Sequence, residues 1–401
     1  MSLTKRQACF LILVCLVSNK LQRLPNFIAT NVHRNGYFVF LILGTIDILM
    51  MCLILITNKR SKHRDVYQIC QRAGGNVFAK IIMFMLSIFF FISALIPYES
   101  IHDLFAYVLF DHLSWEVYSI LLISAIFFLA SKGIKNIGRT TELFFYFMFI
   151  SLLGLLVLGV TTTHFERILP IYNINFSKIL KTCFDYSIWF GDFFIVYMFI
   201  GKIKEDDGKI GWQFILVQCI GVLIVTFAYI VFYGIYENLA PNQGSLISSI
   251  SQFSLLNLDI GRVDLLLVLA FEFSTFIASA VFVYSASHCL SKIFEVKNKI
   301  FTLIPLIITM YVLDITLFKS VQVGAGVLSF VTRYFYPVII LFVPISVLLA
   351  TYRANSKDKK QRFVNNVQPL EYLTKKSSRQ YQKSKKKNKS IPSKKRRAYN
   401  E

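Results

Sequence analysis

Charged residues are scarce in this sequence. Asp, Glu, Lys and Arg make up 16% of its 401 residues, whereas an ordinary soluble domain carries roughly 25%. Hydrophobic residues reach 55%, and a single water-soluble core cannot hide so large a share. The composition therefore excludes an ordinary soluble globular protein and indicates a chain whose solvent is lipid.

Motifs for metal binding and catalysis are also missing. The seven cysteines show neither C-x-x-C spacing nor a companion cluster of histidines, so we expect no disulfide framework and no metal site. No HExxH sequence, phosphate-binding loop, nucleophile elbow or nucleophile–base pair occurs. The sequence therefore predicts no catalytic residues, no cofactor and no enzyme.

Long apolar runs are abundant. Runs near the roughly 20 residues that a helix needs to cross a bilayer recur along most of the chain. We predict one all-α polytopic membrane domain over residues 1–352, with ten transmembrane helices. The predicted spans cover residues 8–29, 38–56, 77–96, 117–130, 143–160, 179–200, 214–233, 265–290, 301–318 and 334–350.

The loops between these spans alternate in charge. Four of them are basic and fall on the same side as the N-terminus, whereas the stretch 97–115 on the opposite side has no Lys or Arg and carries three acidic residues. Because Lys and Arg concentrate in cytoplasmic loops, both termini are predicted to be cytoplasmic. The basic loops are those near residues 59–72, 132–139, 202–209 and 292–299.

The last segment, residues 353–401, has a different composition. It holds 17 Lys and Arg against 3 Asp and Glu, and it has too few apolar residues to form a core, so we predict a disordered cytoplasmic tail. Next to a membrane, such basic clusters attract anionic lipids. Nucleic-acid binding is not favoured, because no pattern of stacking aromatics accompanies the charge.

Two of the predicted spans are interrupted by polar residues. The first contains Ser18-Asn19-Lys20-Leu21-Gln22-Arg23, and the sixth contains Asp185 to Asp192 with Gly191 between. A secretory signal peptide is the alternative for the first, since Lys5 and Arg6 precede its apolar core, but no small-x-small cleavage site follows. Broken helices are tolerated at membrane depth only where they are buried in protein or line a wet cavity. We therefore interpret both breaks as parts of a binding site.

The positions of the breaks predict the architecture. They lie five spans apart, so the second half of the chain enters the membrane from the opposite side, as in an inverted five-plus-five repeat of the LeuT type. In such folds the solute lies between the two breaks. The predicted ligand-binding residues are Ser18, Asn19, Lys20, Arg23, Ser187, Trp189, Phe190, Gly191, Asp192, Glu272, Ser274 and Thr275.

Several ionisable residues in the spans have two interpretations. Asp47 and Asp314 either serve function or pair with a neighbouring hydroxyl or cation, whereas Glu272, followed by Ser274 and Thr275, favours function. Lys20 and Arg23 could clamp a carboxylate or replace a coupling ion, or their side chains could extend toward water.

Short motifs resemble those of a known family. They include Leu24-Pro25, the run 132–139 ahead of Glu142-Leu143, Leu169-Pro170, Trp189-Phe190-Gly191 and Gly261-Arg262-Val263-Asp264. In this order the chain resembles the B subunit of spore-germination nutrient receptors, a branch of the amino acid–polyamine–organocation permeases. The resemblance implies a small nutrient ligand, most simply an amino acid, and a receptor with A and C subunits in the cell membrane or spore inner membrane.

Two departures from the family pattern concern the ligand. Ser18-Asn19-Lys20 replaces small residues at the first break, and Asp192 stands where a second small residue is common. The first change adds bulk and charge where a ligand carboxylate would meet backbone N–H groups. The second, by charge complementarity, favours a cationic or differently sized nutrient. In the loops, we expect Arg139 to pair with Glu142, and Arg262 with Asp264 to fix a helix start.

Three functions stay open at this point. The first is a membrane subunit of a spore germinant receptor, the second is a secondary transporter for amino acids, and the third is a structural membrane partner without ligand binding. One broken-helix scaffold can serve each of them, so fold alone does not separate them.

Overall fold

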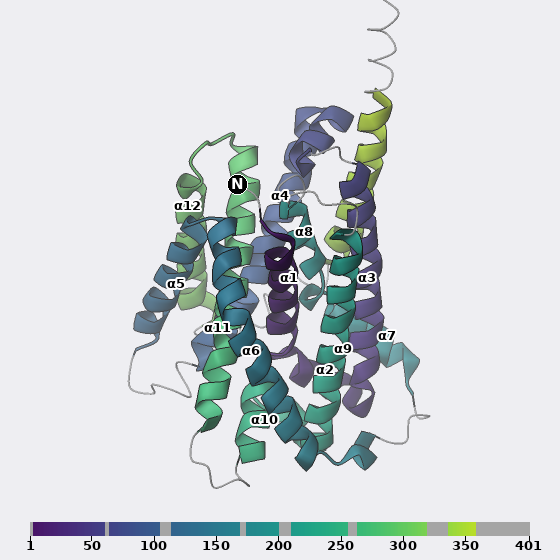
Figure 1. The fold of residues 1–401 in the computed structure, drawn as a ribbon, viewed down its shortest axis with the longest axis vertical. Coiled ribbons are helices and arrows are strands. Elements are labelled where there is room, and N and C mark those ends of the chain that lie inside the picture. The colour runs from purple at the N-terminus through teal and green to yellow at the C-terminus, as the bar shows by residue number, and fades with distance from the viewer. Residues whose placement is uncertain are drawn as a thin grey trace, which may run out of the picture.

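The computed structural model describes residues 3–60, 64–104, 114–168, 174–199, 210–255, 263–318 and 336–357. Every regular element in these ranges is helical, and no strand occurs in them (Figure 1). The predicted all-α class is confirmed.

Within the described residues, six helices are long and apolar enough to cross a bilayer. Two shorter apolar helices, α5 (Trp115–Ser131) and α12 (Ile300–Leu313), accompany them. The crossing count of ten stays a prediction. The long helices are α3 (Gly36–Arg60), which continues from α2, α4 (Val66–Leu104), α6 (Ile134–Thr162), α9 (Ile210–Tyr236), α11 (Val263–Ile293) and the last helix, Tyr336–Lys357.

The first predicted span is broken into α1 (Lys5–Lys20) and α2 (Leu24–Val32). Thr4 and Gln7 form a reciprocal capping box that fixes the start of α1. Pro25 lies at the start of α2, and its ring would clash with the Leu21 carbonyl if α1 continued. The chain therefore leaves the helix between Lys20 and Leu24.

The sixth predicted span is broken as well. It consists of α7 (Phe176–Asp185), two 3₁₀ turns (Ser187–Trp189 and Asp192–Phe194) and α8 (Ile195–Phe199). Gly191, between the two turns, has a φ of +119°, a backbone angle that residues with a side chain rarely adopt. A Cβ there would also lie 2.7 Å from the Phe89 ring. Both predicted interruptions are thus present in the structure.

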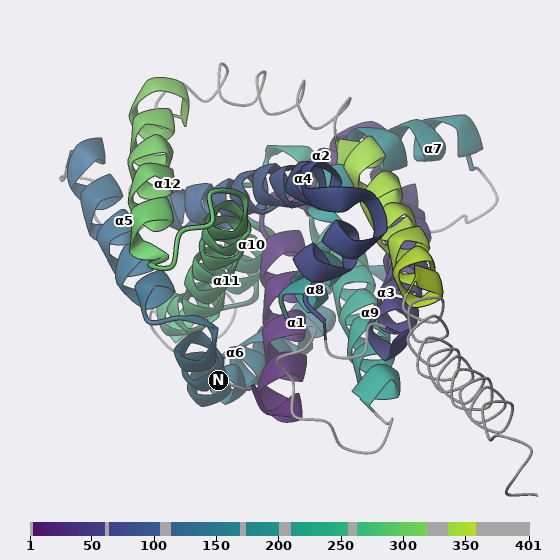
Figure 2. The same ribbon diagram turned by 90° about the horizontal axis from the view of Figure 1, so that it is seen from above.

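Helix α1 lies near the centre of the bundle, against α6, α9 and α11 (Figure 2). Its residues from Leu11 to Lys20 are all buried. A helix buried on every side needs no amphipathic pattern. The central position of α1 brings the first break into the interior of the protein.

The outer helices present apolar faces outward. On α6, Leu143, Phe147, Ile150 and Val157 are each at least 63% exposed, and their spacing places them along one face of the helix. An apolar stripe of this kind would promote aggregation in water, whereas it is favourable in contact with lipid. The protein is an integral, multi-pass membrane protein.

Several basic segments gather at the end of the bundle that holds the N-terminus (Figure 1). Lys292 at the end of α11 forms an ion pair with Asp65 before α4 (3.1 Å), and Asn355 donates to the Arg60 carbonyl (3.0 Å). This grouping agrees with the alternation of charge in the loops. The predicted tail lies outside the described residues, except that 353–357 continue the last helix.

One described α-helix is covered by none of the predicted spans. Helix α10 (Leu246–Leu255) lies between α9 and α11 and contacts both, as well as α6. The backbone N–H of Leu246 donates to the Gln22 carbonyl (3.2 Å). Helix α10 therefore covers part of the first break from the end away from the N-terminus.

Close packing of α3 on α9 gives a stability prediction. A Cβ at Gly44 would lie 2.5 Å from the Val222 side chain, whereas a Cβ at Gly154 on α6 has no atom within 4 Å. We expect Gly44→Leu to destabilise the protein by about 1–3 kcal/mol through overpacking. The thermal unfolding midpoint of the detergent-purified protein measures the effect. Gly154→Leu is the matched control, and equal midpoints for the two variants would contradict the packing.

Candidate functional site

The first break ends in a buried ammonium group. Lys20 is the last residue of α1, and its side chain is 1% exposed. Its Nζ donates to Asp192 Oδ2 in the second break and lies 3.4 Å from Asp47 Oδ2 on α3. Both carboxylates are as buried as the lysine. One cation therefore joins the two interrupted segments to a third helix.

Two neighbours complete the surroundings of this ammonium. Asn19 Nδ2 donates to Asp192 Oδ1 (3.3 Å), and Lys20 Nζ lies 4.6 Å from the centroid of the Phe190 ring, a favourable cation–π distance. Gly191 separates Phe190 from Asp192 and allows the sharp turn between them. Five predicted residues, Asn19, Lys20, Phe190, Gly191 and Asp192, thus lie together.

A second polar cluster joins the first break to α11. Gln22 Nε2 donates to Glu272 Oε1 (2.8 Å) and to Thr275 Oγ1 (3.0 Å). The Ser18 and Ser274 hydroxyls are 2.8 Å apart. The second oxygen of Glu272, Oε2, is buried and has no hydrogen-bond partner among the described residues. The predicted residues of α11 therefore lie beside the first break, with one carboxylate oxygen unsatisfied.

Three predicted residues lie apart from this centre. Arg23 forms an ion pair with Glu99 of α4 (2.9 Å) and is partly exposed. Ser187 donates to the Phe184 carbonyl (3.0 Å), a local bond of its own segment. The Trp189 ring lies 5.8 Å from that of Phe27 on α2. Arg23 therefore contacts α4, whereas Ser187 and Trp189 contact their own segment and α2.

Sequence reasoning left two central residues out of the predicted site. For Asp47 the sequence leaves open whether it serves function or pairs with a neighbour, and the geometry supports pairing with a cation, Lys20. Gln22 was noted only as part of the polar run, yet it bonds Glu272, Thr275 and Ser245. Its position in the break was the available signal, since a polar side chain there needs buried partners.

Asp314 also pairs with a hydroxyl. Its Oδ2 accepts from Ser119 of α5, and His102 Nε2 lies 4.0 Å from the same oxygen. This cluster joins His102 of α4 and Ser119 of α5 to the turn Asp314–Phe318 that follows α12. The pairing supports the structural interpretation of Asp314 over a role in the ligand site.

One predicted loop pair is wrong. Glu142 accepts from Arg6 and from Gln7 Nε2 (2.9 Å) rather than pairing with Arg139. The N-terminal segment reaches the start of α6, which local sequence spacing could not reveal. Gly261, Arg262 and the Leu169-Pro170 motif lie outside the described residues.

The charges at the centre favour a cationic group. Lys20 carries the positive charge facing Asp47 and Asp192, and Glu272 adds a third buried carboxylate. Burying carboxylates in excess of cations is costly unless a proton or a cationic ligand balances them.

Residues 2–323 match the family described as spore germination protein. The chain belongs to the spore germination protein family. This result confirms the family resemblance that the sequence motifs indicated, and it makes the protein a member of a receptor and permease family. No curated protein matches the chain.

The fold is similar to that of a solved structure, MhsT in complex with L-phenylalanine. The two share 13% sequence identity with a TM-score of 0.59, over 86% of this chain and 98% of MhsT. At this identity the likeness establishes the fold alone. The predicted LeuT-like fold with broken first and sixth segments is confirmed, whereas the ligand-binding roles of the twelve predicted residues stay a prediction.

The buried ion pair gives a second prediction. Lys20→Met leaves two carboxylates without their cation, and we expect the free energy of unfolding to fall by about 3–5 kcal/mol. Adding Asp192→Asn removes one of these charges, so the double variant should be more stable than Lys20→Met. Thermal unfolding midpoints in detergent measure both effects.

The matched control for this prediction is an exposed ion pair. Lys80 and Glu295 are 3.1 Å apart at the surface, and Lys80→Met should cost less than about 1 kcal/mol. A double variant that is less stable than Lys20→Met would contradict the proposed charge balance.

Proposed function

We propose that this protein is the nutrient-sensing membrane subunit of a spore germinant receptor. The nutrient, most simply an amino acid, binds between the broken first and sixth segments, and its binding triggers germination. The observation that carries this proposal is the ion pair of Lys20 and Asp192, which joins the two breaks. The family match supplies the biological setting.

The charge at the breaks suggests how a nutrient acts. The ammonium group of an amino acid would compete with Lys20 for Asp192 and Asp47. The nutrient carboxylate would find backbone N–H groups released by the interruptions. Because Lys20 joins the two broken segments, its displacement would weaken the contact between them. A ligand shifts a conformational equilibrium only if it binds one conformation more tightly than the other, and such a competing contact provides that difference.

The partners and location follow from the same proposal. The protein assembles with the A and C subunits of the receptor in the spore inner membrane or cell membrane. The end that holds the N-terminus and the basic loops faces the cytoplasm. The basic tail contacts anionic lipids there.

Secondary transport of amino acids is the alternative function. It is favoured by the similarity of the fold to MhsT, a protein solved with a bound amino acid. Broken-helix folds of this type serve alternating access in transporters. Uptake therefore has to be measured alongside binding.

Binding of a panel of radiolabelled amino acids to the protein in nanodiscs tests the proposed site. We expect saturable binding of at least one of them. Gly191→Leu should abolish this binding, because the side chain meets Phe89 and the backbone conformation disfavours it. Gly154→Leu, in open space on α6, is the control and should bind as the wild type does.

Two further measurements separate the alternatives. Deletion of the gene should abolish germination in response to the nutrient that binds, and proteoliposomes should show little net flux of it. Concentrative uptake would identify a transporter instead. Binding that persists in Gly191→Leu would place the ligand elsewhere.

A further inference from the structure

A polar pocket lies at the end of the bundle away from the N-terminus. Its volume is about 400 Å³, within the range of small-molecule sites. Residues from six helices and turns line it, and none of them is among the twelve predicted ligand-binding residues. The lining residues are Asn31, Val32, His33, Arg34, Asn35, Arg167, Asn175, Lys178, Ile179, Tyr233, Glu237 and Asn238.

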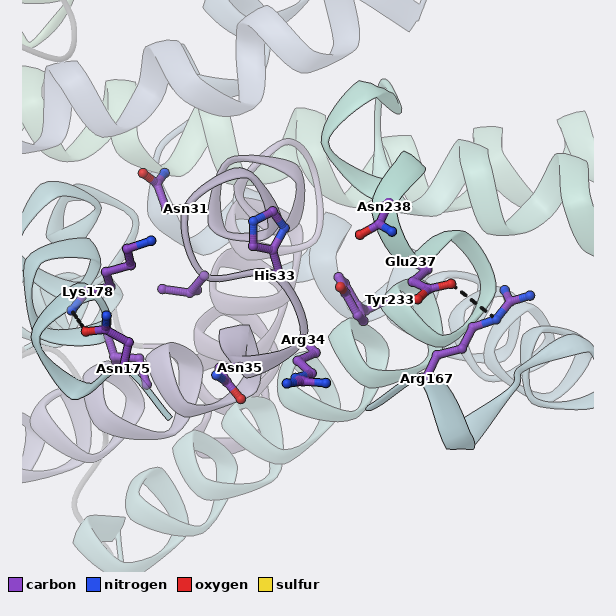
Figure 3. A pocket seen from close by; sticks show the side chains of 12 residues that line it. Asn31, His33, Arg34, Asn35, Arg167, Asn175, Lys178, Tyr233, Glu237 and Asn238 are labelled. Carbon is purple, nitrogen blue, oxygen red and sulfur yellow. Dashed lines mark hydrogen bonds and ion pairs between the residues drawn. The ribbon is translucent and has the colours of Figure 1, made fainter. Parts of the chain in front are cut away.

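The pocket carries an excess of positive charge. Arg34, Arg167 and Lys178 line it against a single carboxylate, Glu237. Figure 3 shows Lys178 at one end and the Arg167–Glu237 pair at the other, with Arg34 between them. The Lys178 ammonium has no ion-pair partner in the described part of the chain. A ligand whose charge complements this excess of positive charge is an anion.

The location of these cations is unusual for a membrane protein. Lys and Arg concentrate at the cytoplasmic end of such proteins, and here several basic segments cluster with the N-terminus. Arg34, Arg167 and Lys178 lie at the opposite end, in and beside the short turns that follow α2 and α6 and near the start of α7. Three exceptions to the charge bias that converge on one pocket indicate a specific use.

The backbone around the pocket is strained. Three described residues other than glycine have positive φ, and two of them, His33 (φ 49°) and Glu237 (φ 47°), line this pocket. The surrounding structure holds both in place. Tyr229 OH donates to the His33 carbonyl (2.5 Å), and Arg167 Nη1 donates to the Ile235 carbonyl (2.7 Å). Strain maintained in this way clusters at functional sites.

Two further features suit an anion. Helix α7 begins at the pocket, with Asn175 as its cap, so the positive end of the helix dipole faces the hollow. Asparagine side chains in the lining supply amide groups, and although Asn31 already donates to the Phe27 carbonyl and the Tyr186 hydroxyl, Asn175 and Asn238 carry Nδ2 donors at the pocket. A carboxylate or phosphate group would find both charge and hydrogen bonds there.

We propose that this pocket binds a small anion through a carboxylate or phosphate group, with Lys178 and Arg34 as its charged contacts. The site is separate from the nutrient site at the breaks. It lies between the turn that follows α2 and the start of α7. Helices α2 and α7 are the outer halves of the two broken segments, the halves that lie at the end of the bundle away from the N-terminus. The source of the anionic group is either a soluble metabolite or the headgroup of an anionic lipid.

Binding of inorganic phosphate and of succinate to the full chain tests this proposal. With the protein in phosphatidylcholine nanodiscs at low salt, calorimetry should show saturable binding of at least one probe, weakened by added salt. Lys178→Gln should weaken it about tenfold, as expected for loss of a charged hydrogen bond. Lys178→Arg should retain it, because the positive charge and a donor stay in place.

The same helix offers a matched control. Lys181 is on α7 and is exposed, as Lys178 is, but it does not line the pocket, so Lys181→Gln should change the affinity by less than about twofold. Equal losses in Lys178→Gln and Lys181→Gln, or no binding of either probe in any nanodisc, would overturn the proposal.

A second arm distinguishes the two sources of the anion. In nanodiscs that contain phosphatidylglycerol, a site that takes lipid headgroups should lose affinity for phosphate, whereas a site for soluble anions should keep it after correction for surface charge. Each result supports an anion site and names its occupant. An affinity independent of Lys178 in both lipids would contradict it.

Discussion

The buried ammonium of Lys20 is the constraint on which the interior of this protein depends. A lysine side chain at this depth is tolerated only if carboxylates and hydrogen bonds replace the water that it loses. Asp192 and Asp47 meet that need from two different segments. Because one of them lies in the second break, the two interruptions have to face each other. This arrangement is possible because α1 lies at the centre of the bundle and because Pro25 prevents α1 from continuing as a helix.

The same ion pair gives the proposed receptor a means of responding to its ligand. A continuous helix cannot offer main-chain groups to a solute, whereas the two breaks do. In the proposed function, the ligand is a second cation that competes with Lys20, so ligand binding and the coupling of the two segments would use the same carboxylates. A shared contact of this kind is a physical basis for sensing, since it changes the relative stability of two arrangements.

The two ends of the bundle differ in their charge. At the N-terminal end the cations pair across loops or belong to basic segments, as Lys292 with Asp65 does. At the other end fewer cations are present, and three of them surround one pocket next to the outer halves of the broken helices. The proposed anion site and the proposed nutrient site therefore contact the same two broken segments, but at different depths in the bundle.

The sequence by itself determined the class, the order of the spans and the two breaks. These features are local: hydrophobic runs decide which segments enter lipid, and Pro25 and Gly191 decide where helices end. Only the tertiary structure decided which polar residues meet. Gln22 and Glu272 are 250 residues apart in sequence, and Glu142 pairs with the N-terminal segment rather than with nearby Arg139. Helices that are apolar on most faces carry little local information about their neighbours, so packing alone sets those partners.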